Sequence, residues 1–493
     1  MNLAKSLLSY WHPRTHDDKT ICIIGAGPTG LAALKTVLDT EQYKSGTYKP
    51  TAFEARDQVG GVWQVLHHDP EEPSEPEGDE IPPRSALYDS LTTNIPHPVM
   101  AYSSLPFPPS TPLYPVAHVV EDYLKAYADH FGLNAHIRLR TTVIALQFDS
   151  ESSKWKVELS TGEMHFFDWV VVCPGHYNKP RYPATPGLSE WLRDKRASHS
   201  SWYRRPQNVI GDKILVVGNG PSGIDISAEL SRHGKTLVRS ITGGAGEEEG
   251  SVIIRPHAVR YEEGGSVVFE DGSTETGIDH CILATGFEMS FPFLSDEDLV
   301  PGFPTAVPPL PQELYNSTYH IFSLAQHLFP FQSRFPATTI AFLGLLIKVA
   351  PFPLVEAQAR AAIHVFAHPH ELDVAKETAV IVTRYEQLRA ELQTEDPLTL
   401  AKAWHVFKGS EQFDYRDELY AYTAPSFGGD VIAVPQWEKD MYDNKMTLKK
   451  VWFDLVKEGL ADDWVRDVDK LCIRVAIFFS IAALNAVAEL YWV

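Results

Sequence analysis

The feature that most constrains this chain is a short pattern that occurs twice: an apolar run, a glycine-rich turn and a segment with helical spacing. The first copy has TICII at residues 20–24, then GAGPTG at 25–30, then a helical pattern over 31–38. The second copy has ILVV at 214–217, followed by GNGPSG at 218–223. Short continuous apolar runs are typical of strands buried on both faces of a parallel sheet. The repeat therefore predicts an α/β fold with two Rossmann-like units.

Both turns have the G-x-G-x-x-G spacing, in which each glycine has a physical role. The first permits a tight turn, the second lets the backbone approach a pyrophosphate, and the third lets the helix pack closely on the strand. The helix N-terminus then offers free N–H groups and the positive end of its dipole to the phosphates. A strand before each turn and a helix after it are the context that the motif requires. We therefore expect both turns to bind dinucleotides rather than to be ordinary turns.

The residue that ends the second strand of each unit predicts which dinucleotide that unit binds. In the first unit, residues 48–55 read as this strand, and Glu54 stands where an acid would bind ribose hydroxyls. In the second unit, residues 236–240 end on Arg239 and Ser240 with no acid, and an arginine suits a 2′-phosphate. We therefore expect NADPH rather than NADH in the second unit. The alternatives are a solvated strand-end carboxylate for Glu54 and a surface cation for Arg239.

Length and charge limit the classes of function. The 493 residues exceed one ordinary core, so two or three domains are expected. A formal net charge of -21 would repel a phosphate backbone, which argues against nucleic acid as a partner. The N-terminus has no secretory signal pattern, and the apolar run at 475–484 is shorter than the ~20 residues that a membrane-spanning helix needs. We expect that run to be a buried helix rather than a membrane anchor.

The 4 cysteines are Cys22, Cys173, Cys281 and Cys472. None of them forms a CxxC pair, which argues against a disulfide framework, a zinc site and a disulfide reductase. A reducing, cytoplasmic location fits this cysteine usage best. The sequence also offers no obvious metal cluster and no catalytic triad.

The rest of the chain predicts further elements. Residues 69–83 are rich in Pro, Glu and Asp and read as an exposed loop. Residues 117–131 read as an amphipathic helix, and residues 155–159 and 166–173 as strands of a meander. The apolar run at 281–284 reads as one more buried strand. Beyond it the chain is mostly helical, with breaks marked by prolines.

A set of motifs that spans both turns matches a known family. Besides the turns and Glu54, the set comprises Gly60-Gly61-Val62-Trp63, Tyr88-Asp89-Ser90-Leu91-Thr92-Thr93-Asn94, Cys173-Pro174-Gly175-His176 and Ala284-Thr285-Gly286-Phe287. On these residues the chain resembles the flavin-containing monooxygenases, and their fungal members most of all. The likeness runs from about residue 20 to past residue 352. Matching both turns and the stretch between them is far more specific than matching either turn alone.

The resemblance implies a discontinuous FAD domain, made of residues 1–205 and 291–493, with an NADPH domain inserted at 206–290 and a mostly helical C-terminal region. It implies that FAD is held by Gly25, Ala26, Gly27, Pro28, Thr29, Gly30, Glu54, Val62 and Trp63. It implies that the flavin and the nicotinamide meet at Thr93 and Asn94. The residues expected to hold NADPH are Gly218, Gly220, Ser222, Gly223, Ile224, Asp225 and, from the strand-end argument, Arg239.

One departure from the family concerns the segment between the two turns. The family's fingerprint there reads F-x-G-x-x-x-H-x-x-x-[FY]. His199 and Tyr203 keep their spacing, but Arg193 and Lys195 occupy the Phe and Gly positions. Trp191 could fill the aromatic role after a small insertion. His199 is equally compatible with a hydrogen-bonded turn and with a role in supporting catalysis.

The resemblance also implies the reaction. NADPH reduces FAD, the reduced flavin adds O2 to form a C4a-hydroperoxyflavin, and an amine nitrogen or a thiol or thioether sulfur of a small substrate takes one oxygen atom. The flavin supplies the chemistry, while the protein must keep water away from the peroxide. Asn94 is the predicted catalytic residue, because an amide can donate and accept hydrogen bonds without titrating. The alternative is that Asn94 caps a turn before Pro96.

Two other functions stay open. A Baeyer–Villiger monooxygenase, which inserts oxygen beside a ketone, shares the plan of two turns. A non-catalytic protein could keep a nucleotide site for structure, although two intact turns argue against it. The sequence leaves the substrate open, and it leaves a homodimer open. We expect the pocket walls to come from the loops near residues 102–113 and from the C-terminal helices.

Overall fold

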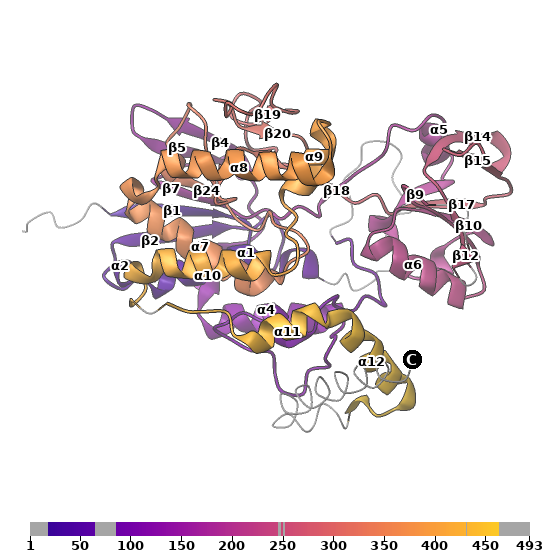
Figure 1. Ribbon diagram of the computed structural model, residues 1–493. Coiled ribbons are helices and arrows are strands. Elements are labelled where there is room, and N and C mark those ends of the chain that lie inside the picture. The colour runs from indigo at the N-terminus through magenta and orange to yellow at the C-terminus, as the bar shows by residue number, and fades with distance from the viewer. Residues whose placement is uncertain (1–17, 65–84, 245–247, 250–251, 430, 463–493) are drawn as a thin grey trace, which may run out of the picture.

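The computed structural model describes residues 18–64, 85–244, 248–249, 252–429 and 431–462. The predictions for residues 69–83, for residues 475–484 and for Cys472 lie outside the described residues. Figure 1 shows a larger unit, which contains the first and the last described elements of the chain, and a smaller unit beside it. In the part of the chain that the structure describes, no helix has the length and apolar character needed to cross a membrane.

The larger unit is built on a five-stranded parallel sheet with the order β24-β7-β1-β2-β3. β1 (Lys19–Ile24) lies between β7 (Trp169–Val172) and β2 (Tyr48–Phe53), and β3 (Ile137–Arg138) follows β2 at the edge. β24 (Ile340–Phe342) pairs with β7 from the other side, although the whole smaller unit separates the two strands in sequence. The predicted arrangement of a discontinuous unit with a second unit inserted in it is confirmed.

The two faces of this sheet bury different side chains, because consecutive residues of a strand point to opposite faces. Ile21 and Ile23 of β1 face a core that is shared with helices. These helices include α1 (Pro28–Asp39), α4 (Ala117–His130) and α7 (Pro351–Ala367). Cys22 and Ile24 face a second core, which an antiparallel meander covers. The β1-turn-α1 unit is therefore fixed from both sides.

The apolar stretch at residues 166–173 divides between two sheets, which corrects the prediction that it belongs to the meander. The meander consists of β4 (Val143–Asp149), β5 (Lys154–Leu159) and β6 (Met164–Phe167). β7 instead pairs in parallel with β1. The two strands part at Asp168, whose carboxylate accepts hydrogen bonds from the Thr20 backbone N–H (2.9 Å) and hydroxyl (2.7 Å). A polar anchor thus lets one apolar run supply strands to two sheets.

The smaller unit is built on a six-stranded sheet with the order β12-β13-β11-β10-β17-β9. Its strands are β9 (Ala197–His199), β10 (Lys213–Val217), β11 (Thr236–Ser240), β12 (Glu248–Glu249), β13 (Val252–Arg255) and β17 (His280–Leu283). Neighbouring strands in this order pair in parallel, except β12 with β13, which pair antiparallel. Helix α6 (Pro221–Arg232) packs on one face. Because β9 belongs to this sheet, the sheet takes in residues upstream of 206, where we expected the inserted domain to begin.

Two chain crossings join the units, and they pair with each other. β8 (Lys179–Pro180) leads toward the smaller unit and β18 (Phe287–Glu288) leads back, in an antiparallel pair. The fully buried His199 lies beside them: its Nδ1 accepts the Ser201 backbone N–H (3.1 Å), so its Nε2 carries the proton and donates to the Gly286 carbonyl (3.0 Å). Burial lowers the pKa of His199 to about 4. His199 is thus a neutral, hydrogen-bonded residue at the joint between the units.

The departure from the family fingerprint has a conformational consequence. Lys195, at the glycine position, has a φ of 56°, in the left-handed region that glycine adopts without cost. Arg193, at the Phe position, is exposed. Trp191 is buried in its place, packs against Tyr261 and donates its indole N–H to the Glu262 carbonyl (3.0 Å). The aromatic role is therefore filled two residues earlier in the chain.

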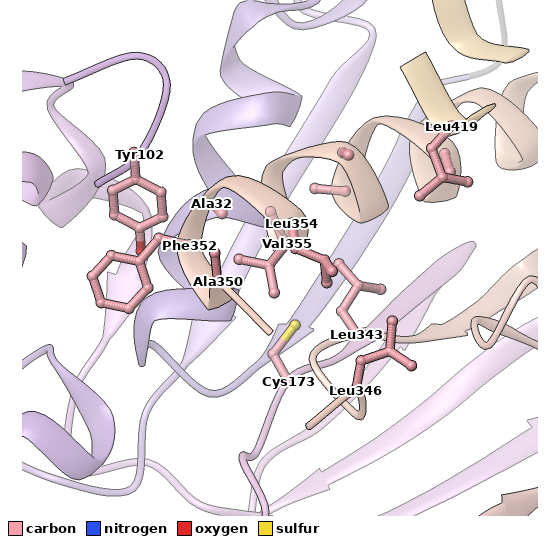
Figure 2. Close-up of a cluster of buried hydrophobic side chains, with 14 of the residues drawn as sticks. Ala32, Tyr102, Cys173, Leu343, Leu346, Ala350, Phe352, Leu354, Val355 and Leu419 are labelled. Carbon is pink, nitrogen blue, oxygen red and sulfur yellow. The ribbon is translucent and has the colours of Figure 1, made fainter. Parts of the chain in front are cut away.

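The prediction that the chain is mostly helical after residue 284 is wrong for residues 285–350, which hold the short strands β18 to β24 and no α-helix, and it is confirmed for the described chain from α7 on. After α7 come α8 (Val374–Leu392), α9 (Pro397–Trp404), α10 (Glu411–Thr423), α11 (Gln436–Asp443) and α12 (Lys445–Glu458). Figure 2 shows Tyr102 facing Phe352 at the start of α7, with Ala32 of α1 close by. The two rings stack with centroids 4.9 Å apart. Tyr102, Phe107 and Leu113 are buried in this core, and the expectation that their loops wall the substrate pocket stays a prediction.

Candidate active site

The first glycine turn connects β1 to α1. At two of its glycines, Gly25 and Gly30, the surrounding backbone leaves no room for a side chain. Gly25 has a φ of +98°, and a Cβ there would lie 2.5 Å from the Cys173 carbonyl oxygen. A Cβ on Gly30 would lie 1.9 Å from the Gly25 carbonyl oxygen. Gly27 precedes the helix and has no side chain with which to cap it. The first N–H groups of α1 are therefore available to an anion such as a pyrophosphate.

Glu54 lies directly beside this turn, one residue after β2. Its side chain is buried; Oε2 accepts the Ala26 backbone N–H at 2.7 Å and Oε1 accepts the Arg56 backbone N–H at 2.9 Å. A carboxylate offers about four lone-pair positions, so these two bonds leave capacity for hydroxyl donors. The position suits the predicted binding of a ribose.

Two other segments close over the first turn. The segment at Gly60 and η1 (Gly61–Trp63) packs on it: Gly60 N–H donates to the Ala26 carbonyl at 3.1 Å, and a Cβ on Gly61 would lie 2.9 Å from Gly27 Cα. The Val62 carbonyl accepts the Ser85 hydroxyl at 2.8 Å. From beyond β24, Gly344 approaches so closely that a Cβ would lie 2.7 Å from Thr29 Oγ1. Both halves of the larger unit therefore contribute to the first cradle, which comprises the turn at residues 25–30 together with Glu54, residues 60–63 and Gly344.

The second glycine turn repeats the construction of the first between β10 and α6. Gly218 has a φ of +124°, and a Cβ there would lie 2.3 Å from the Ala284 carbonyl oxygen. A Cβ on Gly223 would lie 2.4 Å from the Gly218 carbonyl oxygen. At Gly220, in contrast, a Cβ would meet no described heavy atom within 4 Å. Ile224 in the first turn of α6 is 45% exposed, so this cradle opens to solvent.

The strand-end residues of the smaller unit have different environments. The Ser240 hydroxyl donates to the Pro256 carbonyl at 2.9 Å and accepts the Ala258 N–H at 3.0 Å, so it is used inside the unit. Arg239 is buried at the end of β11 on the same face as Leu237, which packs in the core beneath α6. Arg239 is therefore on the α6 side of the sheet, as a contact to a nucleotide would require.

A polar junction connects the two units near the cradles. The Tyr88 hydroxyl donates to Asp225 Oδ2 at 2.9 Å, which joins the larger unit to α6. The buried Thr93 donates its hydroxyl to the Ile95 carbonyl at 2.8 Å. Asn94 is exposed, and its Oδ1 accepts a hydrogen bond from Lys449 Nζ at 3.2 Å.

Lys449 of α12 is a junction residue that sequence reasoning missed. Burial lowers the pKa of Lys449, and the negative charge of Asp225 opposes that shift. The ammonium group thus contacts Asn94 and is close enough to Asp225 for the two charges to interact. In Figure 1, α12 lies below the smaller unit. The chain separates Lys449 from Asn94 by 355 residues, and no motif surrounds it, so no signal in the sequence pointed to this contact.

The described cysteines do not form a redox center. Cys22, Cys173 and Cys281 are free and buried. Burial raises the pKa of the Cys281 thiol to about 12 and raises those of Cys22 and Cys173 as well. A thiol that exchanges with disulfides needs exposure and a lowered pKa. Disulfide reduction through these three residues therefore does not fit their environment.

The fold and the two cradles define a class: a protein with one Rossmann-like unit inserted in another, each with its own dinucleotide site. The family described as flavin-binding monooxygenase-like matches residues 18–246 and 248–401. The chain belongs to this family. It is a flavoprotein monooxygenase that uses FAD and NADPH.

Named relatives cover most of the chain. It is 28% identical over 447 residues to the flavin-containing monooxygenase FMO GS-OX-like 4 of Arabidopsis thaliana, covering 86% of this chain and 90% of that protein. It is 31% identical over 362 residues to the thiol-specific monooxygenase of Saccharomyces cerevisiae, covering 71% of this chain and 78% of that protein.

Solved structures agree with this assignment. The S-allyl-L-cysteine S-oxygenase from Allium sativum matches with a TM-score of 0.69 and 25% identity, covering 94% of this chain and 98% of that one. A cyclohexanone monooxygenase matches with a TM-score of 0.52 and 13% identity, covering 84% of this chain and 99% of that one. The second likeness shows the shared fold alone.

Proposed function

We propose that this monooxygenase transfers one oxygen atom of O2 to a soft nucleophile of a small substrate, with thiol or thioether sulfur as the first candidate and amine nitrogen as the second. The names of the yeast thiol-specific monooxygenase and the garlic S-allyl-L-cysteine S-oxygenase support sulfur. The observation that carries the proposal is the junction between the two units. There Tyr88 of the larger unit is hydrogen-bonded to Asp225 in α6, the helix that begins at the second cradle.

The first cradle would hold FAD. The N–H groups at the start of α1 suit its pyrophosphate, and Glu54 suits a ribose. The remaining predicted contacts lie in or beside the same cradle: Gly25, Ala26, Gly27, Pro28, Thr29, Gly30, Val62 and Trp63. When bound, FAD supplies the oxygen-transfer chemistry, and the chain supplies binding and orientation.

The second cradle would hold NADPH. The N–H groups of Ser222 and Gly223, at the start of α6, suit the pyrophosphate, while the exposed Ile224, whose own N–H donates to the Gly220 carbonyl (3.1 Å), would line the site. Arg239 would bind the 2′-phosphate, for which a guanidinium is well shaped. Asp225 would link this site to the larger unit through Tyr88.

Asn94 would donate a hydrogen bond to the reacting oxygen. Lys449 can only donate, so the end of the Asn94 amide that faces it must be Oδ1. That contact uses Oδ1 and leaves the two N–H groups of Nδ2 as the donors of the amide. Lys449 is then a positioning residue that fixes the orientation of the amide.

Product analysis tests the proposed reaction. The purified yellow enzyme would be supplied with NADPH and O2 and, in separate reactions, with a thioether, a thiol, an amine and a ketone, while H2O2 is measured in parallel. We expect oxygenated product from a sulfur compound or the amine, in proportion to the NADPH consumed. An ester formed from the ketone, without any product from the other three, would establish Baeyer–Villiger chemistry instead. A protein that consumes no NADPH would be a non-catalytic binder.

We also propose that the enzyme works in the cytoplasm. The free, buried thiols of the described cysteines support a cytoplasmic location. A homodimer stays a prediction, which light scattering on the eluted protein tests by the mass of the particle.

A further inference from the structure

The C-terminal end of α7 gathers three groups that can ligate a metal ion. His364 and His368 are four residues apart at the end of this helix, so their side chains lie on one face. Glu371 follows in the short helix η7 (Pro369–Glu371). One potential ligand atom from each residue lies within 4.8 Å of the other two. The sequence did not predict this cluster. Glu371 lies near the two histidines only because the chain bends between α7 and η7, and the residue pattern does not reveal that bend.

Contacts among the three groups show that their side chains already converge. His364 Nε2 lies 2.8 Å from Glu371 Oε2, and the rings of His364 and His368 stack with centroids 5.0 Å apart. A tetrahedral zinc ion with bonds of about 2.0–2.1 Å holds its ligand atoms about 3.4 Å apart. To admit the ion, His364 Nε2 and Glu371 Oε2 would have to separate by roughly half an ångström, and the ligand atom of His368, which lies within 4.8 Å of the other two, would have to approach by up to about 1.4 Å.

Each imidazole has its Nδ1 engaged by the protein. His368 Nδ1 lies 3.2 Å from the His364 carbonyl oxygen, which can only accept, so this nitrogen carries the proton and Nε2 keeps its lone pair. His364 Nδ1 lies 2.7 Å from the Ser426 hydroxyl in η8 (Ala424–Ser426). Histidines that bind metals have their second ring nitrogen held in this way, which fixes the tautomer and the orientation of the ring.

We propose that His364, His368 and Glu371 form a binding site for a divalent transition-metal ion of the zinc class, with a fourth position open to water. Two neutral imidazoles and one carboxylate are a ligand set that Zn²⁺ accepts. Mg²⁺ and Ca²⁺ prefer oxygen ligands and are disfavoured by the two nitrogens. The site lies farther along α7 than the part of the helix that contacts the first cradle: it is roughly 9 Å beyond Gln358, which accepts the Gly344 N–H, at 1.5 Å per residue.

The bound ion would stabilise the C-terminal helical layer. It would tie the end of α7 to η7, and through Ser426 it would also hold the segment after α10. An ion that binds only the folded chain raises the free energy of unfolding. The site therefore has a readout that does not depend on monooxygenase activity.

Metal binding is tested on FAD-loaded enzyme from which the affinity tag has been removed and which has been treated with a chelator. Isothermal titration with ZnCl2 should show one site with a Kd in the micromolar range or below, and MgCl2 should show none. Glu371→Gln and His368→Ala should each weaken that Kd at least tenfold. The matched control is His118→Ala, which removes an exposed histidine from α4 and should leave the Kd unchanged.

Thermal unfolding provides a second measurement on the same proteins. Zn²⁺ should raise the Tm of the parent enzyme and of His118→Ala by several degrees, and it should leave the Tm of Glu371→Gln almost unchanged. Glu371 is exposed and its replacement by Gln keeps the shape of the side chain, so this variant should fold. Equal zinc affinity in the parent and Glu371→Gln, or no stoichiometric binding in the parent, would overturn the proposal.

Discussion

The two glycine turns share one construction, but the protein surrounds them differently. At Gly27 in the first turn, a Cβ would lie 3.3 Å from Gly61 Cα, because a second segment packs on the turn. At Gly220 in the second turn, a Cβ would meet no described atom within 4 Å. Ala26 is 1% exposed, whereas its counterpart Asn219 is exposed.

This difference bears on how long each dinucleotide stays bound. The motif provides the phosphate site in both units, since the helix start is the same. The segments packed on the first turn would have to move before its ligand could leave, whereas no described residue packs over Gly220 in the second turn. We therefore expect FAD to stay bound through many turnovers and NADPH to exchange in each one.

The largest expected effect comes from Gly30→Ala in the closed cradle. The new Cβ would lie 1.9 Å from the Gly25 carbonyl oxygen, so the helix must move away from the turn. We expect the variant to lose FAD and all activity, with a stability loss of about 1–3 kcal/mol from overpacking. The ratio of flavin to protein absorbance measures the first effect. Normal flavin content would contradict the assignment of this cradle.

Gly223→Ala is the matching change in the open cradle. Its Cβ would lie 2.4 Å from the Gly218 carbonyl oxygen, which displaces the start of α6. We expect a full complement of FAD and a KM for NADPH raised about 100-fold, equivalent to roughly 2.7 kcal/mol. Steady-state NADPH oxidation and the flavin spectrum measure the two quantities. Loss of FAD in this variant would show that the cradles are not independent.

Arg239→Ala sharpens the distinction between the two ligands. If this guanidinium binds the 2′-phosphate, the KM for NADPH should rise about tenfold, or roughly 1.4 kcal/mol, while the KM for NADH should hardly change. The ratio of the two KM values is an internal control, because general damage to the smaller unit would raise both. A parallel rise in both values would remove this role for Arg239.

Asn94→Ala tests the junction between the cradles. We expect the variant to bind FAD and oxidise NADPH, with a severalfold larger share of the electrons released as H2O2, because a hydrogen bond to the reacting oxygen is lost. Coupled assays of NADPH and H2O2 measure that share. Asn134→Ala, at an exposed asparagine outside the junction, is the control. Unchanged coupling in Asn94→Ala would leave Asn94 as a turn residue.

The smallest expected effect is at the joint between the units. Lys195 has a left-handed φ of 56°, so Lys195→Gly should relieve strain and stabilise the protein by about 0.5–1 kcal/mol. Denaturant unfolding measures the change. Arg193→Gly, at an exposed residue of α5 (Leu188–Arg193) without a positive φ, should instead destabilise the protein. If both variants changed the free energy of unfolding in the same direction, the left-handed φ of Lys195 would not explain the effect of its replacement.

The sequence predicted features that depend on local patterns. Each glycine turn was found with its flanking strand and helix, because turn, strand and helix are signalled within some 20 residues. The insertion of one unit in the other followed from the family resemblance, and β24 confirms it by returning to β7.

Features that depend on distant contacts were missed. The division of residues 166–173 between two sheets depends on the pairing of β7 with β1. Lys449 meets Asn94 only because α12 returns to the junction. Tyr102 is a core residue because it packs on Phe352. None of these partners is near in sequence, so periodicity and spacing carried no information about them.

The central claim is that a closed cradle retains FAD while an open cradle exchanges NADPH. Gel filtration of the purified enzyme, followed by anaerobic addition of NADPH under a spectrophotometer, tests it most directly. We expect the eluted protein to be yellow, NADPH to bleach the flavin absorbance, and a second gel filtration to remove the nicotinamide nucleotide but not the flavin. A protein that elutes colourless and binds no added flavin, or a bound flavin that NADPH does not bleach, would contradict it.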